Sequence, residues 1–164
     1  MLNSADPAFV AQLAAGLPPD TLRTPEARYL EEPRSRWTGQ AGALALPRNT
    51  DDVARIVRLA AAARVGIVPW GGGTGLVGGQ VMPDGPKPLV LSLERMAALR
   101  GAYPQENTLL VEAGMVVATA QGHAAGLDRL FPLSLASEGT ARQWMAVTGC
   151  AMIEGWGMSE TCAI

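Results

Sequence analysis

Residues 69–79 carry the most distinctive pattern in this chain, Pro69-Trp70-Gly71-Gly72-Gly73-Thr74-Gly75-Leu76-Val77-Gly78-Gly79. Six glycines in eleven residues are costly to order, because glycine loses more backbone entropy on folding than any other residue. Glycines also let the backbone approach a ligand closely, and successive N–H groups in such a loop bind anions. Thr74 adds a hydroxyl donor. The pattern therefore predicts a loop that binds phosphate or pyrophosphate, and a glycine-rich surface turn is the alternative.

The context of the loop argues against two common phosphate-binding motifs. Residues 73–78 match G-x-G-x-x-G, but a Rossmann loop must open into a helix whose N-terminus holds the pyrophosphate. Residues 80–87 contain two prolines and a glycine and precede an apolar run, so no helix fits there. A P-loop requires Lys followed by Ser or Thr after its last glycine, whereas Gly78 is followed by Gly79-Gln80. The loop must then bind the phosphate without a helix behind it.

Two helices are predicted upstream of the loop. The first begins at Asp6-Pro7, a capping carboxylate followed by proline at the first helical position, and ends at Gly16. The second is predicted over residues 50–65, with the Thr50 hydroxyl as its cap. Its apolar side recurs at helical spacing and comprises Val53, Ile56, Val57, Ala60 and Ala61.

Short apolar runs predict strands over residues 42–46, 65–68, 88–93, 108–113 and 130–133, and residues 115–125 predict a third helix that ends at Gly126. The order strand, helix, strand, glycine loop, strand, strand, helix, strand is typical of an α/β or α+β domain. Residues 20–40 predict an irregular lead-in in which Glu31 and Glu32 are solvated.

Composition excludes several classes of function. The chain has 164 residues and a net charge of −2, so it lacks the basic surface expected of a nucleic-acid-binding protein. Its most apolar run, residues 59–70, contains Arg64 and is too short for a membrane span of about 20 residues. The N-terminus has no positively charged segment before a long apolar run, so no signal peptide is predicted. Two cysteines and one histidine argue against a disulfide scaffold or a zinc site and favour a cytoplasmic location.

The composition changes near residue 141. The last 23 residues hold both cysteines, two of the four tryptophans and three of the seven methionines. This change predicts a boundary between residues 141 and 142, and a chance fluctuation in a short window is the alternative.

The glycine loop and four later segments together resemble a known family. The loop fits Pro-x-Gly-Gly-x-Thr-Gly-x-x-Gly-Gly, and the later segments are residues 89–96, Val111-Glu112-Ala113-Gly114, Phe131-Pro132-Leu133 and Ser137-Glu138-Gly139-Thr140. These residues resemble the FAD-binding domain shared by vanillyl-alcohol oxidase and p-cresol methylhydroxylase. Within that family they are most similar to the FAD-linked D-2-hydroxy acid dehydrogenases, which include the FAD-linked component of glycolate oxidase, D-lactate dehydrogenase and D-2-hydroxyglutarate dehydrogenase.

The resemblance implies a fold, a cofactor and a set of binding residues. The fold would be α+β, with α/β subdomains, as in the p-cresol methylhydroxylase type of FAD-binding domain. The loop would wrap the FAD pyrophosphate, and because residues 69–79 contain no histidine the FAD would be bound non-covalently. The implied pyrophosphate residues are Gly71, Gly72, Gly73, Thr74 and Gly75, with Pro69, Leu76 and Gly78 shaping the loop. The implied flavin-side residues are Pro132, Leu133, Gly139 and Thr140.

The resemblance implies three segments and leaves the activity open. Residues 1–36 form a helix and lead-in, residues 37–141 an incomplete FAD-binding domain, and residues 142–164 a tail of different origin. The tail, with Glu154-Gly155-Trp156-Gly157-Met158-Ser159-Glu160-Thr161, resembles the adenylate-forming motif of fatty acyl-CoA synthetases. The expected function is the FAD-binding portion of an oxidoreductase that acts on a 2-hydroxy acid, with no catalytic residue assigned. The alternatives are an inactive truncated or fused gene product and a nucleotide-binding module without catalysis.

Overall fold

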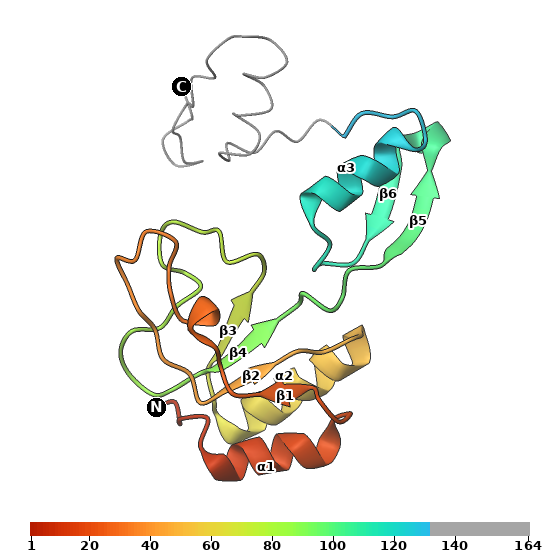
Figure 1. Cartoon of the computed structure of the whole chain (residues 1–164). Coiled ribbons are helices and arrows are strands. Elements are labelled where there is room, and N and C mark those ends of the chain that lie inside the picture. Colours follow the sequence, from red (N-terminus) through yellow and green to blue (C-terminus); the bar gives the residue numbers. More distant parts are fainter. Residues whose placement is uncertain (132–164) are drawn as a thin grey trace. The chain divides into compact units, whose positions relative to one another are not determined.

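The computed structural model describes residues 1–131 (Figure 1). They contain helices and strands in a mixed order, which confirms the predicted α+β class. The helices are α1 (Pro7–Gly16), α2 (Thr50–Ala63) and α3 (Val117–Ala125), with two short 3-10 helices, η1 (Ala27–Tyr29) and η2 (Pro104–Glu106). The strands are β1 (Leu22–Arg23), β2 (Ala43–Ala45), β3 (Ile67–Trp70), β4 (Leu89–Ser92), β5 (Leu99–Tyr103) and β6 (Thr108–Val111).

Four strands form one sheet in the order β1-β2-β4-β3. Strands β2, β4 and β3 are parallel, and β1 pairs antiparallel with β2 at the edge. Helix α2 makes the crossover from β2 to β3, which leaves room for β4 between them. The carboxyl ends of the three parallel strands therefore meet at one edge of the sheet, and the glycine loop leaves from that edge.

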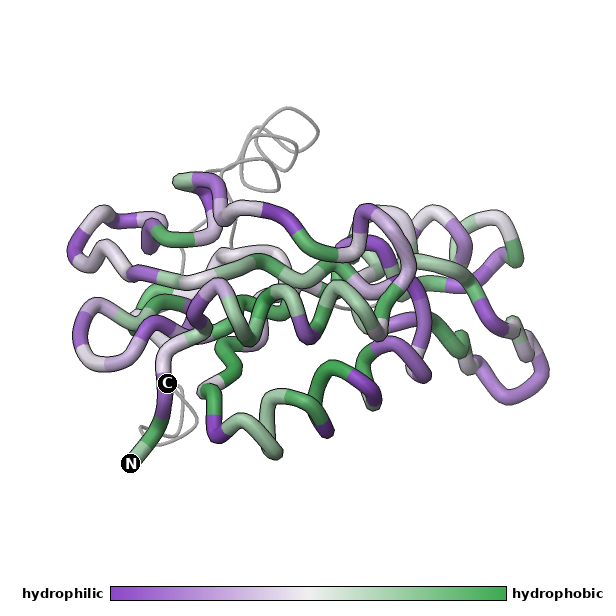
Figure 2. Tube along the Cα trace, turned by 90° about the horizontal axis from the view of Figure 1, so that it is seen from below, coloured by the Kyte–Doolittle hydropathy of each residue, from purple (hydrophilic) through white to green (hydrophobic). Residues whose placement is uncertain are grey.

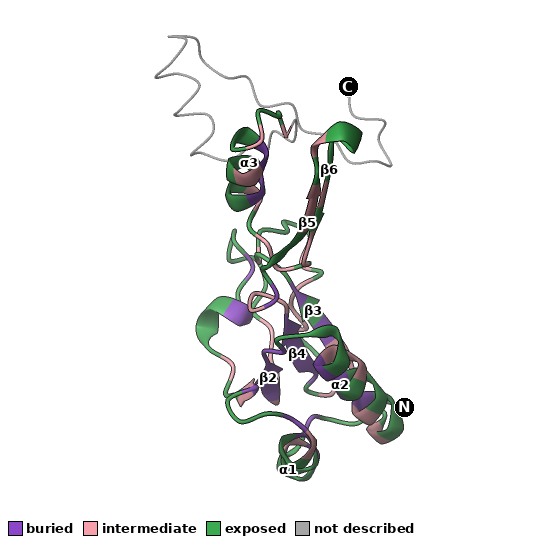
Figure 3. Ribbon diagram, turned by 90° about the vertical axis from the view of Figure 1, so that its right-hand side faces the viewer, coloured by how far each residue is buried: buried purple, intermediate pink, exposed green. Residues whose placement is uncertain are grey.

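Both faces of this sheet are covered, as is usual where parallel strands predominate. One face packs against α1 and α2, and its core includes Ala43, Leu89 and Ile56. The other face carries Leu44, Val90 and Trp70, which pack with Tyr29 of the lead-in. Figure 3 shows β2, β3 and β4 as a largely buried layer and the outer sides of the helices as exposed. Figure 2 shows apolar and polar residues alternating along the helical segments.

The helix caps explain where α1 and α2 begin and where β3 begins. Asp6 caps α1 by accepting a hydrogen bond from the Phe9 N–H at 2.8 Å, as predicted. The cap of α2 is Asn49, whose side chain accepts from the Asp52 N–H, so the prediction of Thr50 as the cap is wrong. At the other end of α2 the Val65 N–H bonds back to Ala60, which is why β3 begins at Ile67 and not at residue 65.

Strands β5 and β6 form a separate antiparallel pair with a register irregularity between Leu99 and Gly101. The predicted strand at residues 108–113 corresponds to β6, and the predicted third helix corresponds to α3. Strands β1 and β5 were not predicted, because a two-residue edge strand and a strand interrupted by glycine lack alternation. Residues 130–131 lie outside any strand, and the rest of the predicted strand at 130–133 lies outside the described residues.

Candidate functional site

The glycine loop begins at the last residue of β3 and returns toward β4. Ligands of open parallel sheets bind beyond the carboxyl ends of the strands, which is where residues 71–80 lie. Gly71, Gly72, Thr74 and Gly75 are all exposed. No helix follows the loop, because residues 71–88 contain neither a helix nor a strand. The prediction that no helix follows the loop is confirmed.

Two glycines of the loop are required by backbone conformation and by close contacts. Gly73 has φ +68°, and a Cβ there would lie 2.4 Å from Cζ2 of the Trp70 ring. Gly78 has φ +77°, and a Cβ there would lie 3.0 Å from the Trp37 ring. Side chains rarely adopt positive φ, so both positions shape the loop. The role predicted for Gly78 in an FAD-binding loop stays a prediction.

The loop is held through its carbonyl groups. The Gln80 side-chain amide donates to the Gly75 carbonyl at 2.6 Å and to the Gly73 carbonyl at 3.5 Å. The Gly78 carbonyl accepts from the Val81 N–H at 3.1 Å. Within the described part of the chain, none of the backbone N–H groups of residues 71–80 donates a hydrogen bond. The loop is thus anchored on its acceptor side, and its donors are available to a ligand.

Gly71 and Gly72, at the start of the loop, have open space beside them in the described part of the chain. Among the described residues, a Cβ at Gly71 would meet no heavy atom within 4 Å, and one at Gly72 would meet only the Thr74 methyl at 3.8 Å. Neither has a positive φ. The fold therefore does not require glycine at these two positions. A ligand bound close to their N–H groups would require it, because a side chain would occupy the space of the ligand. Free donors beside unfilled space are what the pyrophosphate of FAD needs.

Gly75 is a different case. It has no positive φ, and a Cβ there would meet the Gln80 Oε1 at 2.9 Å, the mobile end of a flexible side chain. Among the glycines of residues 71–79, only Gly73 and Gly78 have a positive φ.

A polar cluster lies at the same edge of the sheet, on the face that carries Trp70. Tyr29 is buried at 1% exposure and packs edge-to-face on Trp70 with ring centroids 4.7 Å apart. Its hydroxyl donates to Glu94 at 2.9 Å, and the Arg28 guanidinium lies 4.4 Å from its ring centroid. Burial, and then the hydrogen bond to the Glu94 carboxylate, raise the pKa of Tyr29 to about 12. This cluster fixes the lead-in against the strand that precedes the loop.

Glu32 was predicted to be solvated, and this prediction is wrong, because the residue is 1% exposed. Its Oε2 accepts from the Arg34 and Arg36 N–H groups at 3.1 and 3.2 Å, so the side chain organises a turn of the lead-in. Its Oε1 has no partner in the described part of the chain. Two adjacent glutamates in a charged segment give no sequence signal of which one is buried.

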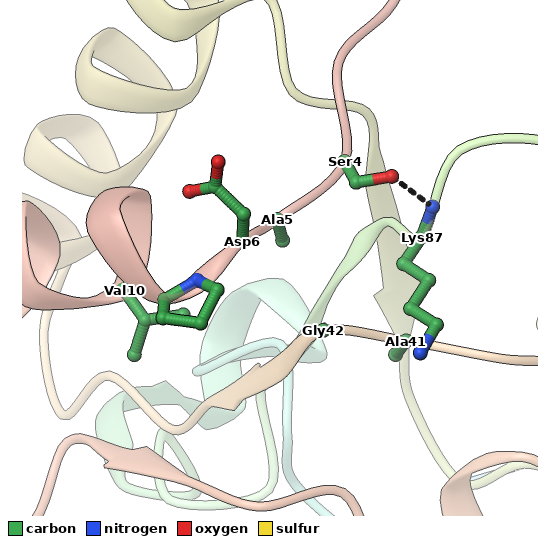
Figure 4. Close-up of a pocket in the computed structure, with 8 residues that line it drawn as sticks. Ser4, Ala5, Asp6, Val10, Ala41, Gly42 and Lys87 are labelled. Atoms are coloured by element: carbon green, nitrogen blue, oxygen red, sulfur yellow. Dashed lines mark hydrogen bonds between the residues drawn. The ribbon is translucent and has the colours of Figure 1, made fainter.

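The pocket drawn in Figure 4 is a separate feature with a volume of about 530 Å³. It is lined by Ser4, Ala5, Asp6, Pro7, Val10, Ala41, Gly42 and Lys87. The Ser4 hydroxyl accepts from the Lys87 N–H at 3.1 Å, and the Asp6 carboxylate already caps α1. None of the predicted site residues lines this pocket.

The other predicted site residues are distributed as follows. Pro69 lies in β3 opposite Leu91, and Leu76 is exposed in the loop. Pro132, Leu133, Gly139 and Thr140 lie outside the described residues, as does the tail 142–164. Among residues 1–131, no group of three or more His, Cys, Asp or Glu residues is arranged to hold a metal ion. No helix in that part of the chain is long and apolar enough to cross a membrane.

Comparison with known proteins gives consistent matches. A family described as an FAD binding domain matches residues 41–161, which extends across the predicted boundary at residues 141 and 142. The chain is 36% identical over 134 residues to D-2-hydroxyglutarate dehydrogenase from Xanthomonas citri pv. viticola, covering 80% of this chain and 28% of that protein. It is 30% identical over 139 residues to D-2-hydroxyglutarate–pyruvate transhydrogenase from Saccharomyces cerevisiae, covering 84% of this chain and 28% of that protein.

The fold is also found among solved structures. Alkyldihydroxyacetonephosphate synthase matches with a TM-score of 0.64 and 22% identity, covering 77% of this chain and 28% of the synthase. At this identity the match shows the fold alone. Together these findings confirm the predicted FAD-binding fold of the p-cresol methylhydroxylase type. The resemblance of residues 142–164 to acyl-CoA synthetases stays a prediction.

Proposed function

The chain belongs to the FAD-binding domain family, and from this membership we propose that residues 71–75 hold the FAD pyrophosphate through their backbone N–H groups. Gly71, Gly72, Gly73 and Gly75 supply N–H donors, and Thr74 supplies an N–H and a hydroxyl. Pro69, Leu76 and Gly78 shape the loop around them. The observation that carries the proposal is the row of unused donors beside the open space at Gly71 and Gly72.

The cofactor is proposed to bind non-covalently at this loop. Residues 69–79 contain no histidine, so the loop offers no imidazole for attachment to the flavin. Its donors bind FAD by hydrogen bonds to phosphate oxygens, which are stronger than hydrogen bonds between neutral groups. The flavin-side role of Pro132, Leu133, Gly139 and Thr140 is part of the same proposal and rests on the resemblance alone.

The chain spans only 28% of the length of each of the two relatives named above. The reaction is therefore a proposal that rests on the names of these relatives. We propose that the chain is the FAD-binding portion of an oxidoreductase for a small 2-hydroxy acid of the D-2-hydroxyglutarate, D-lactate or glycolate type. Bound FAD supplies a hydride acceptor, so that the substrate loses a hydride from carbon and a proton from its hydroxyl to give the 2-oxo acid. A cytoplasmic location is proposed from the cysteine content.

Titration of the 164-residue chain with FAD tests the binding proposal. We expect flavin absorbance to remain with the protein after gel filtration and FAD to bind more tightly than NAD, because no helix N-terminus follows the loop. A chain that retains no flavin, or binds NAD more tightly, contradicts the proposal.

Addition of D-2-hydroxyglutarate, D-lactate or glycolate to the FAD-loaded chain separates an enzyme from a binding module. We expect the flavin to stay oxidised, because most of the length of the relatives has no counterpart in this chain. Steady bleaching above a free-FAD blank would instead show a complete active site. Loss of flavin binding altogether would favour the inactive gene product.

A further inference from the structure

Trp70 has a buried hydrogen-bond donor without a partner. The residue is 8% exposed, and its indole Nε1 is buried with no acceptor in the described part of the chain. Buried donors in native proteins are almost always bonded to protein, water or a ligand, because an unmet donor costs folding free energy. The packing of the ring does not explain the nitrogen. A phenylalanine would supply an aromatic ring for the edge-to-face contact with Tyr29 without adding an N–H group.

The unpaired N–H lies beside the glycine loop. Trp70 is the last residue of β3, and the loop begins at the next residue. The ring edge that carries Cε2 and Cζ2 lies against Gly73, at 2.9 and 2.4 Å from where a Cβ of that residue would be. Nε1 is bonded to Cε2, so the donor belongs to the ring edge that Gly73 covers.

The chemistry of the donor selects the ligand group. An indole N–H only donates, so it pairs with an acceptor such as a phosphate oxygen and cannot serve a group that only donates. The backbone N–H groups of residues 71–80 are also unused donors in the described part of the chain, and together they favour an anion. We infer that the Trp70 indole N–H donates a hydrogen bond to a phosphate oxygen of the dinucleotide held by the glycine loop. This inference rests on the proposed FAD binding and adds a second side-chain donor, beside the Thr74 hydroxyl, to a site built mainly of backbone N–H groups.

A second unpaired atom offers a competing explanation. Glu32 Oε1 is a buried acceptor, and Glu32 follows Tyr29 by three residues in the segment that packs on Trp70. A hydrogen bond between the two unpaired atoms would satisfy both without a ligand. The experiment must therefore distinguish a Trp70 indole N–H that bonds to phosphate only when the dinucleotide is present from one that is bonded to Glu32 without it.

The test follows the indole N–H signals of the ¹⁵N-labelled 164-residue chain by NMR, with Trp70→Phe identifying the Trp70 signal. We expect the Trp70 signal to shift downfield and its hydrogen exchange to slow when FAD or ADP is added, and to stay unchanged with riboflavin, which has no phosphate. Glu32→Gln should leave the signal of the cofactor-free protein unchanged. The inference is overturned if the Trp70 signal does not shift when FAD is added. It is also overturned if Glu32→Gln shifts that signal in the absence of FAD.

Affinity measurements give the second readout. Trp70→Phe keeps an aromatic ring and removes the donor, so we expect FAD to bind about 10- to 100-fold more weakly while the melting temperature without FAD does not fall. Trp37→Phe is the matched control, because Trp37 also lies beside the loop but is 40% exposed, and its FAD affinity should match that of the unmodified chain.

Each outcome has a separate meaning. If the unmodified chain binds FAD and Trp70→Phe binds it equally well, the inference fails and the proposed function stands. If the unmodified chain binds no FAD, both fail. If Trp70→Phe does not fold, the indole signal of the unmodified chain still decides, assigned by replacing the other three tryptophans with phenylalanine.

Discussion

Two single substitutions, Gly73→Ala and Gly71→Ala, distinguish a ligand-binding loop from a simple turn. Gly73→Ala places a methyl group 2.4 Å from the Trp70 ring at a φ of +68°. A left-handed backbone costs a non-glycine residue about 1–2 kcal/mol, and overpacking typically costs about 1–3 kcal/mol. We expect the free energy of unfolding without FAD to fall by about 2–5 kcal/mol.

Gly71→Ala is expected to act in the opposite way. Its methyl group meets no heavy atom of residues 1–131 within 4 Å and its φ is not left-handed, so the free energy of unfolding should change by less than about 0.5 kcal/mol. The same methyl group occupies the space beside the free N–H groups. Loss of one charge-assisted hydrogen bond, about 1.5–3 kcal/mol, should weaken FAD binding by about 10- to 100-fold.

Urea unfolding without FAD and flavin fluorescence titration measure the two effects. Gly122→Ala is the control, because Gly122 lies in α3 and a Cβ there would meet no heavy atom of the described residues within 4 Å. This variant should bind FAD normally. The reasoning is refuted if Gly71→Ala binds FAD as tightly as the unmodified chain, or if it destabilises the cofactor-free protein as much as Gly73→Ala does.

Three further predictions concern the cap of α1, the buried tyrosine and the loop hydroxyl. Asp6→Ala removes the acceptor of the Phe9 N–H and should lower the free energy of unfolding by about 1 kcal/mol, measured in urea. Because the folded-state pKa of Tyr29 is raised to about 12, its proton is held more tightly in the folded state. Stability is therefore complete below about pH 10 and is lost, by about 2–3 kcal/mol, as the pH rises from about 10 to 12. Tyr29→Phe should abolish that slope in urea unfolding across this pH range, and an unchanged slope would assign it to another group. Thr74→Val keeps the shape and loses one hydroxyl, so FAD should bind about 3- to 10-fold more weakly in the fluorescence titration, with unfolding unchanged because Thr74 is exposed.

The sequence predicts the parts of the fold that depend on local chemistry. In the structure α1 begins at Pro7, with Asp6 as its cap, and ends at Gly16, as predicted. These limits can be predicted because a capping carboxylate and a proline act within one turn. The apolar spacing of residues 50–65 predicts α2 for the same reason. Edge strand β1 and the start of β3 could not be predicted in this way. They depend on pairing with β2, a distant partner, and on a hydrogen bond that closes the end of α2.

The sequence by itself determined that the glycine loop exists, that no helix follows it and that the chain resembles FAD-binding domains, since these depend on residue type and order. Only the tertiary structure decided what each loop residue does. Gly73 is required by the Trp70 ring, whereas Gly71 faces open space, and both read as glycine in the sequence. The unpaired indole of Trp70 and the buried Glu32 are likewise invisible in the sequence. Burial and hydrogen bonding depend on which distant segments pack together, and here the lead-in that carries Tyr29 closes over the end of β3.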